Sequence, residues 1–217
     1  MEHFSAITFA VRQALSAQGV SLPTGHAQQI IAAAFGHNNL ASYQASGEDD
    51  ALPEAEAIVL DIALLDARAA ELGRDARAFA EALTTALQER FPNLDVHSGH
   101  ASLVEEWNAH FEDAIVNDER VISQTAMTNG TFPQADDIQL PWWDGFAPFD
   151  GDDLAFQHDG LVTVDQDEDR VNWGDEIDVR AQLTVQRLGR RLFGRCQIQV
   201  EWAKLRWLGE TGEVPFP

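Results

Sequence analysis

The chain has 217 residues, of which 45% are apolar, enough for a buried core in one large or two small domains. It carries 36 acidic residues against 14 lysines and arginines, a formal net charge of -22, which opposes binding to nucleic acids and anionic membranes and favours association with basic surfaces. The single cysteine, Cys196, excludes an internal disulfide and a thiolate zinc cluster.

No stretch reaches the roughly 18 consecutive apolar residues of a membrane-spanning helix. The opening MEHFSAITFAVRQAL lacks the basic region and small-residue cleavage site of a secretory signal. We therefore expect a cytoplasmic protein without membrane attachment. The excess of acidic residues is explained equally well by a need for solubility alone or by a salty host.

The first 120 residues show the three- and four-residue apolar spacing of helices. A first helix, ended by Gly19, is predicted by Phe4, Ile7, Val11 and Leu15. A second helix follows SLPTG and stops at Gly36, and Asn38 or Asn39 caps a short third helix that runs through Tyr43. Residues 46–56, SGEDDALPEAE, are expected to form a polar linker.

Further helices are expected over about residues 58–72 and 75–90, the second ended by a Phe-Pro-Asn breaker. Ser102 and Glu105 have the spacing of a capping box, which predicts another helix that carries Leu103, Trp107, Phe111 and Ile115.

Beyond residue 120, apolar side chains alternate with polar ones, which is typical of half-buried strands. Two strands are predicted over residues 177–185 and 196–202, and the link LGRRLFG predicts a hairpin with Arg190 and Arg191 near its tip. GLVTVD, residues 160–165, predicts an earlier strand. The sequence thus predicts an α+β protein. Its regions would be a small helical module over 1–46, a helical region over 54–120, and a mainly antiparallel β region with acidic loops over 121–217.

The charge is unevenly placed. From Asp136 to Asp178 there are fourteen acidic residues and one base, Arg170, whereas from Arg180 to Arg206 there are seven bases and one acid. The simplest physical outcome is that part of the acid lies across the basic strands as an intramolecular complement.

Metal binding is one interpretation of the acid. Residues 165–176, DQDEDRVNWGDE, nearly match the ligand spacing of a helix-loop-helix calcium site through Asp165, Asp167, Asp169 and Glu176. However, Arg170 occupies the position where the turn of such a loop needs glycine, and the flanks are strands, so a solvated acidic hairpin competes with this interpretation. His97, His100 and His110, beside Glu105, Glu106 and Asp113, are a second candidate set, for zinc, although His97 and His100 precede the expected helix in a loop, where surface histidine is the commoner case.

Catalytic motifs are absent from the sequence: it has no G-x-S-x-G elbow, no phosphate-binding glycine loop with its lysine, and no deaminase signature. Cys196 falls on the apolar face of a predicted strand, as a structural thiol would. We therefore predict no catalytic residue and no cofactor, and we favour a non-enzymatic protein.

Residues 28–45, QQIIAAAFGHNNLASYQA, have the outline of a helix-turn-helix, but no lysine or arginine occurs between Arg12 and Arg68 to neutralise phosphate. The longer run over residues 14–45, ALSAQGVSLPTGHAQQIIAAAFGHNNLASYQA, resembles the glyoxalase-related protein domain, a short helical module near the start of many bacterial proteins, often plasmid- or mobile-element-associated. Residues 25–31 match its second helix, Phe35-Gly36 its turn, and residues 40–43 its closing segment, while its usual acidic residue in the second helix is missing. The resemblance implies a bacterial or mobile-element source and no activity.

Residues 140–156, LPWWDGFAPFDGDDLAF, interleave aromatic rings with carboxylates, an arrangement that suits docking to a basic, partly apolar partner. The alternative is a long loop whose rings close the core. We predict an acidic interaction protein that binds a basic, nucleic-acid-handling protein as a charge mimic or inhibitor. Its predicted contact residues are Asp150, Asp152, Asp153, Asp159, Asp165, Asp167, Glu168, Asp169, Trp142 and Trp143.

Two other functions stay open at this point. One is a calcium- or zinc-dependent binding module or enzyme that uses the metal candidates above. The other is nucleic-acid binding through the basic hairpin, by Arg187, Arg190, Arg191 and Arg195. The overall charge disfavours direct nucleic-acid binding.

Overall fold

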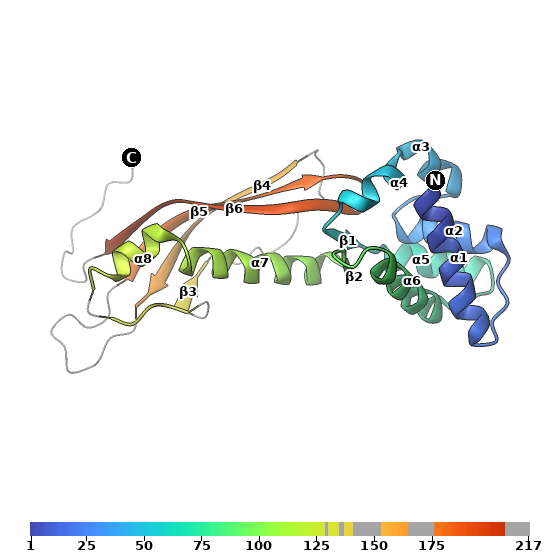
Figure 1. The fold of residues 1–217 in the computed structure, drawn as a ribbon, viewed down its shortest axis with the longest axis horizontal. Helices are drawn as coiled ribbons and strands as arrows, with labels where there is room; N and C mark the ends of the chain where they lie inside the picture. Colours follow the sequence, from blue (N-terminus) through green and yellow to red (C-terminus); the bar gives the residue numbers. More distant parts are fainter. Residues whose placement is uncertain (129, 135–136, 141–152, 165–175, 207–217) are drawn as a thin grey trace. The chain divides into compact units, whose positions relative to one another are not determined.

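The computed structural model confirms the α+β class: helices precede most of the strands of a six-stranded mixed sheet (Figure 1). The structure describes residues 1–128, 130–134, 137–140, 153–164 and 176–206. These form two compact units. Unit 1 is Met1–Glu105 with Gln186–Arg195, and unit 2 is the described part of Glu106–Val185 and Cys196–Pro217. The regions expected as 1–46 and most of 54–120 therefore lie in one unit, together with the tip of a late hairpin.

The first three helices of unit 1 are confirmed: α1 Glu2–Ala17, α2 Thr24–Ala34 and α3 Leu40–Ser46. Gly19 and Gly36 follow α1 and α2 with φ of 82° and 81°, a left-handed backbone that glycine adopts without a Cβ clash. Asn39 caps α3, because its side chain accepts a hydrogen bond from the backbone amide of Ser42 at 2.8 Å.

Residues 46–56 correct the expectation of a polar linker. They form a four-residue helix, α4 Glu48–Ala51, and a 3-10 turn, η1 Leu52–Glu54. Glu48 and Asp49 are only 5% and 3% exposed. Acidic residues are buried at this level only where hydrogen bonds or charges compensate for lost hydration, so this short segment is anchored in unit 1 by Glu48 and Asp49, while residues such as Asp50 and Glu54 are exposed.

The next elements of unit 1 are β1 Ala57–Val59, α5 Ile62–Glu71, α6 Ala76–Arg90 and β2 Asp95–His97. The helix expected over 58–72 therefore begins four residues late, since Ile58 belongs to a strand that the helical pattern concealed. Strand β1 is parallel to β2 and antiparallel to the start of β6, where Ile58 pairs with Leu192. Asp61 caps α5 and Asp75 caps α6 through their side-chain oxygens.

Helix α7, His100–Val116, begins two residues before Ser102, so the expected capping box is wrong. The Ser102 hydroxyl instead donates to the carbonyl oxygen of Gly99 and lies 3.2 Å from Nδ1 of His97. Helix α1 packs on α6 and α2, and α2 packs on α5, around a continuous apolar core.

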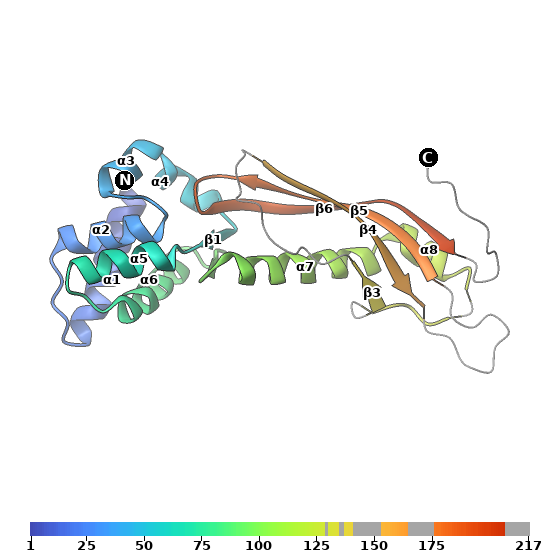
Figure 2. The ribbon, with the colours of Figure 1, turned by 180° about the vertical axis from the view of Figure 1, so that it is seen from behind.

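Unit 2 contains α8 Glu119–Thr125, β3 Ile138–Gln139, β4 Asp153–Thr163 and most of the two long strands β5 Glu176–Arg187 and β6 Leu192–Arg206. The sheet order is β2-β1-β6-β5-β4-β3, and Figure 2 shows β4, β5 and β6 as neighbours. Strand β4 begins earlier than expected, so Phe156 lies in a strand rather than a loop. Residues 165–175 join β4 to β5, as predicted.

Strand β5 confirms the predicted alternation, with Ile177, Val179, Ala181, Leu183 and Val185 buried. Strand β6 does not keep one phase: Val200 is buried, and so is Leu205, five positions later. An odd interval between buried positions shifts the alternation by one residue. Trp202, expected on the buried face, is partly exposed, as are Cys196 and Ile198 at the same positions of the alternation.

Helix α7 supplies the core of unit 2 with Trp107, Phe111 and Ile115. The Phe111 ring meets the imidazole of His158 on β4 edge to face, with the ring centroids 6.0 Å apart. Among the described residues, none of the helices has the length and apolar character needed to cross a membrane.

Candidate functional site

The open face of the unit 2 sheet carries arginines that link neighbouring strands. Arg180 on β5 donates from Nε and Nη2 to the two carboxylate oxygens of Asp159 on β4, at 2.5 and 3.0 Å. Its guanidinium also lies over the indole of Trp202 on β6, 5.5 Å from the ring centroid. One side chain thereby connects three strands.

A second arginine closes the end of the same face. Arg206 on β6 donates from Nη1 to Glu176 at 2.9 Å and from Nε to Asp178 at 3.1 Å, and its Nη2 also bonds Asp178. Both acids lie on β5. Bidentate pairs of this kind are the geometrically specific form of the arginine–carboxylate contact.

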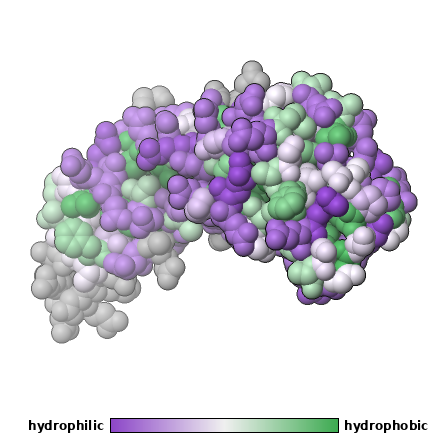
Figure 3. All heavy atoms as spheres, turned by 45° about the vertical axis from the view of Figure 1, so that its right-hand side comes forward, coloured by the Kyte–Doolittle hydropathy of each residue, from purple (hydrophilic) through white to green (hydrophobic). Residues whose placement is uncertain are grey.

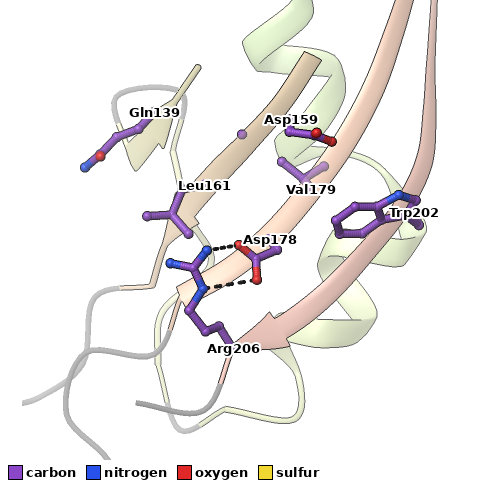
Figure 4. A pocket seen from close by; sticks show the side chains of 8 residues that line it. Gln139, Asp159, Leu161, Asp178, Val179, Trp202 and Arg206 are labelled. Carbon is purple, nitrogen blue, oxygen red and sulfur yellow. Dashed lines mark hydrogen bonds and ion pairs between the residues drawn. The ribbon is translucent and has the colours of Figure 1, made fainter. Parts of the chain in front are cut away.

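An open depression of about 270 Å³ lies between these contacts. It is lined by Gln139, Asp159, Gly160, Leu161, Asp178, Val179, Trp202 and Arg206 (Figure 4). Figure 4 shows the guanidinium of Arg206 facing the carboxylate of Asp178, with Leu161 beside them. A Cβ atom at Gly160 would lie 2.5 Å from Cδ2 of Leu140 and 3.2 Å from the carbonyl oxygen of Gln139, so the Leu140 side chain would have to move to admit a larger residue here.

The ion pairs perturb the pKa values on this face. The hydrogen bond from Arg180 holds the pKa of Asp159 below its usual value, despite partial burial. The partner hydrogen bonds raise the pKa values of Arg180 and Arg206. Asp159, Arg180 and Arg206 are therefore charged at neutral pH.

Of the predicted contact residues, only Asp159 has a described side chain. Asp153 begins β4. The others lie outside the described residues: Trp142, Trp143, Asp150, Asp152, Asp165, Asp167, Glu168 and Asp169. Asp159, Glu176 and Asp178 confirm that part of the acidic segment complements the basic strands within the molecule.

Of the residues considered as metal ligands, some lie outside the described residues and others are described. Asp165, Asp167 and Asp169 lie outside the described residues, and Glu176 pairs with Arg206. Over the described ranges, no three His, Cys, Asp or Glu side chains come together as metal ligands. The structure therefore does not gather His97, His100 and His110 with a further ligand, and the zinc interpretation gains no support from these residues.

The tip of the basic hairpin is bound within unit 1. Arg191 pairs with Asp61, lies 3.2 Å from Nε2 of His100, and packs on Gly36, where a Cβ atom would come within 3.1 Å of it. Burial and the nearby charge of Arg191 lower the pKa of His100. Arg187 donates to the carbonyl oxygens of Gly189 and Arg190. The side chains of Arg187 and Arg191 are thus held by contacts within unit 1, whereas Arg195 is exposed.

Sequence reasoning missed a buried polar cluster in unit 1. Glu48 accepts from the backbone amide of Arg190 at 3.0 Å and lies 3.1 Å from Nε2 of His37. Asp49 accepts from the backbone amide of Phe4 at 2.7 Å. Burial and the charges of Asp49 and Glu48 raise the pKa of Tyr43, whose hydroxyl lies 3.4 Å from Asp49. The only signal in the sequence was a pair of acids directly after a glycine, which is equally typical of a loop.

Ser42, His37 and Glu48 are the residue types of a hydrolase triad, and Nδ1 of His37 lies 3.3 Å from the Ser42 hydroxyl. Yet His37 is 1% exposed, and Glu48 is already occupied by the amide of Arg190. These contacts tie α3, α4 and the hairpin tip together, which is a structural role.

No protein-family model matches this chain, and neither the curated proteins nor the solved structures compared with it give a match. The similarity of residues 14–45 to the glyoxalase-related protein domain therefore stays a prediction that depends on the motif alone.

Proposed function

We propose that the protein is a non-enzymatic, acidic interaction protein that binds a basic protein. The partner that we favour handles nucleic acid, and the acidic surface would occupy its nucleic-acid groove as a charge mimic or inhibitor. A bacterial or mobile-element source belongs to the same proposal. The compartment proposed for this encounter is the cytoplasm.

One observation carries this proposal: many of the few basic side chains form ion pairs with carboxylates of the same chain. In the part of the chain that the structure describes, six arginines are paired with carboxylates: Arg68 with Glu71, Arg77 with Glu81, Arg120 with Asp118, Arg180 with Asp159, Arg191 with Asp61, and Arg206 with Glu176 and Asp178. Since the chain has only 14 basic residues for 36 acids, most of the acid is left uncompensated.

Uncompensated acid produces a field that attracts basic proteins at rates that fall with ionic strength. The face drawn in Figure 3 shows hydrophilic residues over much of its area, with hydrophobic ones interspersed. Exposed apolar side chains that would add contact area include Phe9 in unit 1 and Met127 and Phe132 in unit 2. Association with a basic protein needs both features: acidic residues that attract the partner over a distance, and apolar side chains that add contact area once it is bound.

The test is affinity capture from a bacterial lysate with the full chain as bait, at about 0.1 M and about 1 M salt, where the Debye length falls from about 10 to about 3 Å. We expect a basic nucleic-acid-binding protein to be captured at low salt and lost at high salt. Added duplex DNA should compete for it.

A pair of matched variants separates local from net charge. In one, Asp165, Asp167, Glu168 and Asp169 are replaced by their amides. In the other, the same replacement is made at four exposed acids of unit 1, Glu54, Asp66, Glu89 and Asp95. Both lose four charges, and we expect the first to lose capture and the second to keep it. Capture that is equal at both salt concentrations would contradict the proposal.

A further inference from the structure

The depression on the open face of the unit 2 sheet combines fixed carboxylates with an accessible aromatic ring. Its lining brings together Asp159, Asp178 and Trp202 from three different strands. All are held in place by Arg180 and Arg206. We infer that this depression binds an arginine side chain of the basic partner. The inference depends on the proposed function, of which it specifies the contact.

The first support is the local charge. Arg206 has two acidic partners, Glu176 and Asp178, and Arg180 interacts with Glu201 as well as with Asp159. Four carboxylates therefore face two arginines, and the exposed Lys204 between Trp202 and Arg206 leaves the face with one negative charge in excess. A ligand with one positive charge would neutralise this excess negative charge.

The second support is the indole. The Arg180 guanidinium already lies over the Trp202 ring, so this ring binds a guanidinium within the fold itself. Trp202 is also partly exposed and lines the depression. An arriving cation can therefore contact the same ring system.

The third support is size and lining. About 270 Å³ is below the roughly 300–1,000 Å³ of pockets that enclose small-molecule ligands, so a single side chain fits better than a metabolite. Leu161 and Val179 offer apolar surface for the methylene stem of a long basic side chain. Carboxylates that already accept a bidentate arginine retain lone pairs for another N–H donor.

Arginine is favoured over lysine on geometric grounds. Its guanidinium is planar, stacks on aromatic rings and matches a carboxylate with two parallel hydrogen bonds, whereas an ammonium group is a compact, strongly hydrated charge. We therefore expect the depression to distinguish the two basic residues, which net charge alone would not do.

The experiment measures binding of labelled oligoarginine and oligolysine peptides of equal length to the full chain, by fluorescence anisotropy at about 0.1 M salt. We expect oligoarginine to bind more tightly. Asp178→Asn and Trp202→Leu should each weaken it about two- to fivefold, the range of one exposed charge or ring contact. Lys204→Glu should strengthen it by a similar factor, a gain that loss of folding cannot produce.

The matched control is Glu119→Gln, which removes an exposed charge from α8, and we expect it to leave the affinity unchanged. If oligoarginine binds but the Asp178 and Lys204 variants behave like this control, the inference fails while the proposed function stands. If neither peptide binds, the inference also fails, and salt-sensitive capture from lysate decides the proposed function separately.

Discussion

The buried carboxylate of Glu48 accepts a hydrogen bond at 3.0 Å from the backbone amide of Arg190, a residue 142 positions further along the chain. Its other oxygen lies 3.1 Å from Nε2 of His37. With only 6% of the Glu48 side chain exposed, water cannot replace these partners. The contact fixes the tip of the β5–β6 hairpin to the short helix α4.

Glu48→Ala should therefore destabilise the protein by about 2–4 kcal/mol, because it removes the partner of the buried His37 imidazole and of the part-buried backbone amide of Arg190. Urea denaturation measures the free energy of unfolding. Glu54→Ala removes an exposed acid from the adjacent turn and should change it by less than about 0.5 kcal/mol. Equal losses in the two variants would show that burial of Glu48 does not matter.

Gly189→Ala tests the same contact from the opposite side. A Cβ atom at Gly189 would lie 2.7 Å from Cδ of Glu48 and 2.8 Å from its Cγ, so the carboxylate must leave its position. We expect a loss of about 1–3 kcal/mol. Gly25→Ala is the matched control: nothing lies within 4 Å of its Cβ position, and alanine favours helix α2, so stability should stay constant or rise by about 0.5–1 kcal/mol.

Helix periodicity predicted α1, α2 and α6 well, because those helices bury one apolar stripe each. It failed at residues 57–59, since a three-residue strand is too short to show a period of two. It failed again at Glu48 and Asp49: the partners that make their burial favourable come from residues distant in sequence, such as Arg190 and Phe4. Local patterns do not contain that information.

The stability of unit 1 should fall as the pH drops from about 7 to about 5. His100 has a lowered pKa in the folded state, because burial and Arg191 disfavour its charged form. As the pH falls below 6.5, the pKa of His100 in the unfolded chain, the unfolded chain binds a proton at His100 but the folded chain does not. The free energy of unfolding therefore decreases until the pH reaches the lower pKa of the folded state. Urea midpoints at the two pH values measure this loss.

His100→Gln should make that loss smaller, since glutamine does not titrate. His158 in unit 2 also has a pKa lowered by burial, so His158→Gln should reduce the loss as well, and the double variant should show the sum. A pH dependence unchanged in all three variants would refute this account.

The Arg206–Asp178 pair should couple the ends of β5 and β6. A double-mutant cycle of Arg206→Ala and Asp178→Ala is expected to give a coupling energy of about 0.2–1 kcal/mol, because the pair is bidentate but close to half-exposed at the arginine. The coupling should shrink at about 1 M salt, where charges are screened within about 3 Å. A coupling that does not depend on salt would indicate packing rather than charge.

The candidate site itself was only partly predictable. Alternation along residues 176–187 correctly placed Asp178 and Arg180 on the open face of β5. The alternation over residues 196–202 also holds, with Trp202 partly exposed like Cys196 and Ile198. The contact of the Trp202 ring with Arg180 was not predictable, because it depends on the neighbouring strand and becomes visible only in three dimensions.

The composition of unit 1 also determines when it can form during protein synthesis. Its last segment, Gln186–Arg195, is translated long after Glu105. Until that segment has emerged from the ribosome, Glu48 and Asp61 lack Arg190 and Arg191, and β1 lacks one of its two neighbouring strands. The N-terminal half of this protein is consequently synthesised early but completed late, and its final closure depends on residues near the other end of the chain.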